Sequence, residues 1–80
     1  MNTGWQKTVD LHGMTVNEAK KLLTRELNNC SKNITEVEVV HGFHKGQELL
    51  KMVRGFSHPK VERKILGMNN GMTILLLKNT

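Results

Sequence analysis

Two short segments of this chain share one pattern: a strand-like run that ends in His-Gly, directly before a helix-like segment. The first reads Val-Asp-Leu-His-Gly at residues 9–13, and the second reads Val-Val-His-Gly at residues 39–42. If a helix crosses back between two such strands, the strands are parallel and their carboxyl ends lie at one edge of the sheet. Neighbouring strands are about 4.8 Å apart. We therefore expect His12 and His41 to share that edge and to act on a single bound phosphate.

The first half of the chain predicts a strand, a helix and a second strand. Residues 8–11 have the pattern of a short strand. A capping box at Thr15 and Glu18, followed by apolar residues at helical spacing, predicts a helix over residues 16–30. Residues 36–40 alternate between acidic and apolar side chains, which predicts a strand with one apolar and one solvated face. One side of the sheet is therefore expected to be open.

The second half predicts a helix and a β-hairpin. Pro59 ends the helix, and residues 61–67 have the pattern of a third strand. Asn-Asn-Gly at residues 69–71 suits a tight turn, and residues 72–77 are almost wholly apolar, as an interior strand requires. The helix follows Gly46, and its expected buried stripe consists of Leu49, Leu50, Val53 and Phe56.

These six elements predict an α/β (α+β) fold, a two-layer β-α-β-α-β-β sandwich in which two helices cover one face of a four-stranded mixed sheet. We expect a flexible leader at residues 1–7 and one domain at residues 8–80, with a thin core and no room for a cofactor-sized cavity. The single cysteine, Cys30, excludes an internal disulfide and a thiolate zinc cage. No apolar stretch approaches membrane-spanning length, so we interpret the chain as soluble and cytoplasmic, without a membrane partner.

The excess positive charge lies in one part of the sequence. Residues 1–44 hold five basic and five acidic residues, whereas residues 45–80 hold seven basic and two acidic ones, so the second part carries the whole net charge of +5. Such asymmetry predicts a phosphate-facing surface, because each Lys or Arg near a phosphate releases condensed counterions. The alternative on charge alone is a solvated basic face that aids solubility.

Several of these residues together resemble the small MutS-related (Smr) family over residues 8–78. The resemblance rests on Asp-Leu-His-Gly at residues 10–13, the Glu-Ala pair at residues 18–19, His-Gly at residues 41–42, Pro59 with Val61, and the closing strand at residues 71–77. This family occurs at the carboxyl terminus of larger MutS-like proteins and as stand-alone proteins. Its members are associated with DNA nicking, with RNA cleavage or binding, and with ribosomes. The resemblance thus implies a nucleic-acid ligand, with the ribosome as a further candidate partner.

The second His-Gly turn departs from the family pattern. The family usually has His-Gly-x-Gly there, but this chain reads His-Gly-Phe-His-Lys-Gly at residues 41–46. Glycines let backbone amides approach a phosphate at a helix amino terminus, and here His44 and Lys45 bring side-chain cations instead. We expect Lys45 and the backbone of Gly42 and Gly46 to hold phosphate. We expect this change to preserve phosphate binding more readily than the geometry that cleavage requires.

Phosphodiester cleavage needs a general base, a proton donor for the leaving oxygen and positive charge for the transition state. Asp10 and His12 lie two apart on a strand and so project from the same face. We assign His12 as general base or acid, Asp10 as its orienting partner or a Mg²⁺ ligand, and His41 as second proton donor or phosphate contact. Strict alternation predicts instead that His41 is a satisfied histidine beneath a helix, in a different layer from His12, unless the strand ends twist.

Three functions are consistent with the sequence. The first is an endonuclease that depends on Asp10, His12 and the His41 loop; the second is a non-catalytic module that binds nucleic acid or the ribosome; the third is a protein-interaction domain with incidental basicity. Mg²⁺ is the one cofactor considered, with Asp10 as its ligand. A metal site formed by His12, His41 and His44 is possible on residue type but poorly supported, because no thiolate or carboxylate cluster completes it. The candidate nucleic-acid-binding residues are Gly13, Gly42, His44, Lys45, Gly46, Lys51, Arg54, Lys60, Arg63 and Lys64.

Overall fold

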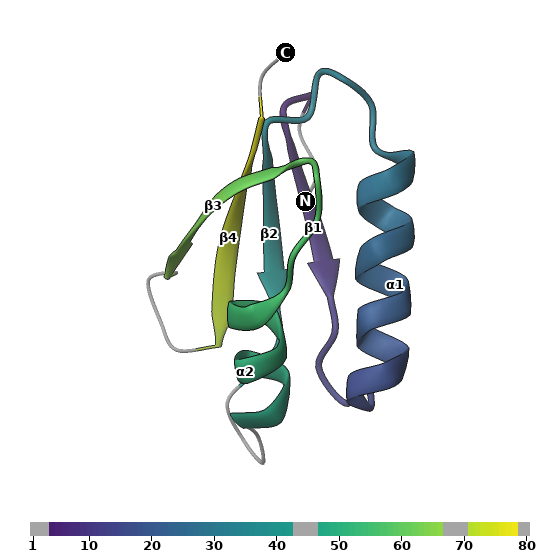
Figure 1. Cartoon of the computed structure of the whole chain (residues 1–80), viewed down its shortest axis with the longest axis vertical. Coiled ribbons are helices and arrows are strands. Elements are labelled where there is room, and N and C mark those ends of the chain that lie inside the picture. The colour runs from purple at the N-terminus through teal and green to yellow at the C-terminus, as the bar shows by residue number, and fades with distance from the viewer. Residues whose placement is uncertain (1–3, 43–46, 67–70, 79–80) are drawn as a thin grey trace.

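The computed structural model describes residues 4–42, 47–66 and 71–78 (Figure 1). Its four strands form one sheet in the order β1-β2-β4-β3, with β1 and β2 parallel and β4 antiparallel to both of its neighbours. This is the predicted mixed sheet, with the apolar last strand inside it. The elements are β1 (Gln6–Asp10), α1 (Val16–Asn29), β2 (Glu36–Val40), α2 (Gln47–Gly55), β3 (Val61–Leu66) and β4 (Met72–Leu77).

The first strand differs from its prediction. It begins at Gln6 rather than at residue 8 and ends at Asp10 rather than at residue 11. The reason is pairing with β2: Gln6 lies opposite Glu36, and its side-chain amide donates a 2.9 Å hydrogen bond to the Glu36 carboxylate. Residues 6 and 7 are therefore part of the sheet and not of a flexible leader.

The second helix also differs from its prediction: α2 ends at Gly55, so Phe56 lies after it and Pro59 does not end it. The remaining boundaries agree closely with the sequence pattern. Strands β2 and β4 have the predicted bounds, and α1 begins as expected and ends one residue early, at Asn29. The predicted capping box starts α1: the Thr15 hydroxyl accepts from the Glu18 amide at 3.2 Å, and the Thr15 amide donates to the Glu18 carboxylate at 3.0 Å. The predicted turn at residues 69–70 lies outside the described residues, but the strands that it joins are antiparallel neighbours.

The hydrophobic core lies between the sheet and the two helices, which cover the same face (Figure 1). Alternate strand residues such as Val9, Val37 and Leu75 are buried against apolar side chains of α1 and α2. Their neighbours on the other sheet face are half-buried or exposed, which confirms that this side is open. In the stripe predicted for the second helix, Leu49 and Val53 are buried and Leu50 is half-buried. Phe56 is also buried, but it follows the end of α2 at Gly55.

Candidate functional site at the carboxyl edge of the sheet

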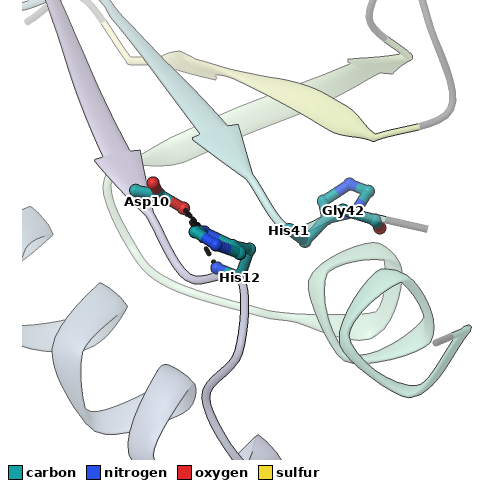
Figure 2. A network of polar contacts seen from close by, with 4 residues as sticks. All are labelled: Asp10, His12, His41 and Gly42. Carbon is teal, nitrogen blue, oxygen red and sulfur yellow. Dashed lines mark hydrogen bonds and ion pairs between the residues drawn. The ribbon is translucent and has the colours of Figure 1, made fainter. Parts of the chain in front are cut away.

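The two His-Gly turns lie side by side at one edge of the sheet, as the repeated pattern predicts. Strands β1 and β2 are adjacent and parallel, and the amide of Leu11 extends their pairing by donating to the Val40 carbonyl at 2.7 Å. A β-carbon placed on Gly42 would lie 3.6 Å from the β-carbon of His12. The backbones of the two turns are therefore nearly in contact (Figure 2).

Asp10 and His12 form a hydrogen-bonded pair on the surface of this edge. Leu11 between them is fully buried, so both of its neighbours are directed outward. The Asp10 Oδ1 atom lies 2.9 Å from the Nδ1 atom of the His12 ring and also accepts from the His12 backbone amide at 3.0 Å. The side chains remain open to solvent, with exposed fractions of 72% for His12 and 57% for Asp10.

This pairing determines the chemical state of both groups. Hydrogen bonds from the His12 side chain, and then from its backbone, lower the pKa of the Asp10 carboxyl below its ordinary value. The carboxylate is thus ionised near neutral pH and can only accept hydrogen bonds. The Nδ1 atom of His12 must be the donor, which leaves the lone pair of the neutral ring on Nε2.

The turn after His12 brings the chain directly into α1. Gly13 has a φ of 82°, in the left-handed region that side chains rarely adopt, and it is exposed. The Met14 amide then donates to the Leu11 carbonyl at 3.1 Å and closes the turn. His12 consequently lies in a closed backbone turn between the end of β1 and the start of α1.

His41 occupies a different environment from His12. His41 is only 3% exposed. Its Nδ1 atom lies 2.9 Å from the Gly42 carbonyl oxygen, and its Nε2 atom lies 3.0 Å from the Thr73 hydroxyl. Figure 2 shows the His12 ring against Asp10 and the His41 ring directed away from that pair. The alternation-based prediction, a satisfied histidine in a different layer, is confirmed.

The backbone amide of Gly42 is not free to hold phosphate, contrary to the sequence-based expectation. It donates to the carbonyl of Gly71 at 2.9 Å, and the His41 amide donates to the same oxygen at 2.9 Å. These bonds tie the second His-Gly turn to the start of β4. The other residues expected in this phosphate contact, His44, Lys45 and Gly46, lie outside the described residues.

The remaining predicted basic residues divide into two groups. Lys60 and Lys64 serve the helix ends: the Lys60 ammonium donates to the Leu27 carbonyl of α1 at 2.8 Å, and the Lys64 ammonium donates to the Arg54 carbonyl of α2 at 2.8 Å. The side chains of Lys51, Arg54 and Arg63 are exposed.

Three further cations, Lys20, Lys21 and Arg25, are exposed on α1 and were not predicted to bind nucleic acid. The count of charges by sequence half hides them, because the acidic residues of the same half cancel them in the sum. Their helical spacing on the solvent face of α1 was the available signal.

A metal site is not completed by protein ligands in the part of the chain that the structure describes. No three His, Cys, Asp or Glu side chains gather there in a way that could hold an ion. At the sheet edge, the Asp10 carboxylate is the one acidic group of the pair, and its Oδ1 atom already accepts two hydrogen bonds. A Mg²⁺ ion at Asp10 would therefore take its remaining ligands from water and substrate phosphate, as Mg²⁺ does where one carboxylate holds it.

Comparisons with known proteins agree with this architecture. The Smr domain model matches residues 9–78. Among solved structures, the chain is similar to the Smr domain of Thermus thermophilus MutS2, with a TM-score of 0.81, 25% sequence identity, and coverage of 90% of this chain and 98% of that one. A comparison with curated proteins gave no match. None of the described helices has the length and apolarity needed to cross a membrane. The chain belongs to the Smr domain family, which is known for nucleic-acid binding and nicking nuclease activity.

Proposed function

We propose that this domain is an endonuclease that cleaves phosphodiester bonds in DNA or structured RNA, with His12 as its general base. The observation that carries the proposal is the 2.9 Å contact between the Asp10 carboxylate and the Nδ1 atom of a His12 ring that is 72% exposed. The contact directs the Nε2 atom of the ring to solvent, where a substrate can reach it. A base that must reach a large substrate needs both features.

The geometry supports separate roles for Asp10 and His12 in the reaction. Asp10 holds the His12 ring so that the Nε2 lone pair faces solvent. That atom takes the proton of an attacking hydroxyl, either water or a ribose 2′-hydroxyl, as the oxygen bonds to phosphorus. The bond to the leaving oxygen breaks, and that oxygen receives a proton from solvent or from the protonated ring. A positioned general base contributes roughly 10² to 10⁴-fold in rate.

In this proposal, His41 is a positioning residue. Its ring is buried, and both ring nitrogens are within hydrogen-bond distance of the Gly42 carbonyl or the Thr73 hydroxyl. It joins the end of β2 to β4 and so holds the second turn against the turn that carries His12. Direct proton donation to a substrate would require this ring to leave its pocket.

The test is cleavage of supercoiled plasmid and of an end-labelled RNA hairpin by the unchanged protein and by His12→Ala, purified identically, with and without Mg²⁺. We expect cleavage of at least one substrate and its loss in His12→Ala, because the variant lacks the base. Equal cleavage by both proteins would reject the assignment. Binding of both substrates without cleavage by the unchanged protein would leave a binding module, including one for ribosomal RNA, as the better description.

A further inference from the structure

The solvent face of α1 carries a row of cations that the proposed catalytic pair does not use. Seven residues on this face line one shared depression, and we call the first five of them the α1 stripe. Three of them are basic, and the other two carry an amide and a hydroxyl. The α1 stripe consists of Asn17, Lys20, Lys21, Thr24 and Arg25.

Among the described residues, the acidic side chains of α1 form no salt bridge with this row. The Glu18 carboxylate accepts from the Thr15 amide in the capping box at 3.0 Å. The Glu26 carboxylate lies 2.6 Å from the Lys7 ammonium of β1, on the side of the helix that faces the sheet. Each acid is thus held by a partner outside the α1 stripe, and within the described residues no salt bridge involves the stripe's three cations.

The α1 stripe also extends toward the carboxyl edge of the sheet, where Asp10 and His12 lie. A second depression is lined by Lys21 and Arg25 together with residues at the start of α1 and in the turn before it: Met14, Glu18 and Leu22. Met14 follows Gly13 and closes the turn after His12. The second depression therefore ends at the turn that follows His12.

We propose that the α1 stripe binds the sugar-phosphate backbone that flanks the phosphodiester at His12, an inference that rests on the proposed function. From Asn17 to Arg25 the helix rises about 12 Å, which matches roughly three to four nucleotides of one strand. The amides of Glu18 and Ala19 at the start of α1 already donate to Thr15, so side-chain cations supply the charge that phosphates need. Asn17 adds an amide donor beside them.

The test compares two double variants that remove the same charge. Lys21→Gln with Arg25→Gln removes two cations of the α1 stripe. Lys32→Gln with Lys78→Gln removes two exposed cations at the opposite end of the sheet, where β4 ends beside the start of β2. Binding of a labelled RNA hairpin and of a DNA duplex is measured between about 50 and 200 mM salt. The two probes show which backbone is preferred.

Log affinity falls as log salt rises. We expect this dependence to be shallower in the stripe variant, with a slope smaller in magnitude by about 1 for each cation removed. The affinity that the variant loses relative to the unchanged protein should therefore be about tenfold smaller at 200 mM salt than at 50 mM salt. The Lys32 and Lys78 control should keep a slope close to that of the unchanged protein. Lys21→Arg with Arg25→Lys should restore binding, because the row needs charge and not a particular shape.

The outcomes separate this inference from the catalytic one. Equal slopes in the stripe variant and its control would overturn the role of the α1 stripe, whatever the cleavage result. Normal stripe dependence with undiminished cleavage by His12→Ala would overturn only the catalytic assignment. If the unchanged protein binds neither probe, both claims are wrong. Melting temperatures of all variants show whether a loss of binding reflects a loss of fold.

Discussion

The two histidine rings at the carboxyl edge of the sheet differ in what holds them and in what they can do. The His12 ring is exposed and bonded through Nδ1 to a carboxylate, which leaves Nε2 directed to solvent. The His41 ring is buried and has neighbours for both nitrogens inside the protein. At the scale of single residues, these environments support our proposal that His12 transfers the proton and that His41 is a positioning residue.

Asp10→Asn tests the orienting carboxylate. The amide has nearly the same shape but no charge, so it no longer stabilises the protonated His12 ring that forms in the reaction. We expect the single-turnover cleavage rate to fall, by no more than the roughly 10² to 10⁴-fold that the positioned base itself contributes. The free energy of unfolding should change by about 0.5 kcal/mol or less, because both side chains are exposed. A cleavage rate equal to that of the unchanged protein would show that the Asp10 contact has no catalytic role.

Thr73→Val tests the structural role of His41. Valine keeps the size of threonine but removes the hydroxyl beside the buried His41 Nε2 atom. We expect a loss of about 1 to 3 kcal/mol in the free energy of unfolding in urea, because a buried polar atom is left without a partner. The matched control is Thr35→Val, an exposed threonine whose hydroxyl makes only a 3.4 Å contact with the Trp5 carbonyl. Similar stability of both variants would contradict this assignment.

At the scale of elements, side chains from the segment before β3 complete the carboxyl end of α1. The last turn of α1 has no basic residue of its own. Lys60 supplies an ammonium group to the Leu27 and Asn28 carbonyls at 2.8 and 3.3 Å. The His58 ring joins the same end: its Nε2 atom lies 2.8 Å from the Asn28 side-chain oxygen, and its Nδ1 atom accepts from the Lys60 amide at 3.1 Å.

This arrangement makes stability depend on pH. Burial, and then the nearby Lys60 charge, lower the pKa of His58 below its usual 6.5. The unfolded chain therefore binds this proton more readily than the folded chain does, and stability falls as the pH drops below about 6.5. Protonation also removes the lone pair that accepts from Lys60. We expect the melting temperature to decrease across this range and the decrease to be smaller in His58→Gln. Identical pH profiles would contradict the role of His58.

At the scale of the whole molecule, local patterns predicted most of the architecture. Alternation predicted both bounds of β2, and the capping box predicted the start of α1. The extra residues of β1 were missed because they depend on pairing with Glu36 in another strand. The helix-capping roles of Lys60 and Lys64 likewise depend on carbonyls that only the folded chain brings near.

The candidate site was also predictable where it depends on local pattern and not where it depends on contacts between distant segments. The period of a strand and the burial of Leu11 are enough to put Asp10 and His12 on one face, and the same period buries His41. The bond from the Gly42 amide to Gly71 was not predictable, because it joins two distant turns. The α1 stripe was missed because a charge sum over half of the sequence does not show which cations share a surface.

We propose that His12 performs chemistry and does not merely contribute to binding. The most direct measurement is the single-turnover cleavage rate of His12→Gln beside its dissociation constant for the same substrate. We predict a rate lower by roughly 10² to 10⁴-fold and an affinity close to that of the unchanged protein, because the phosphate-binding charge lies elsewhere. An unchanged rate, or a rate loss explained wholly by weaker binding, would contradict the account.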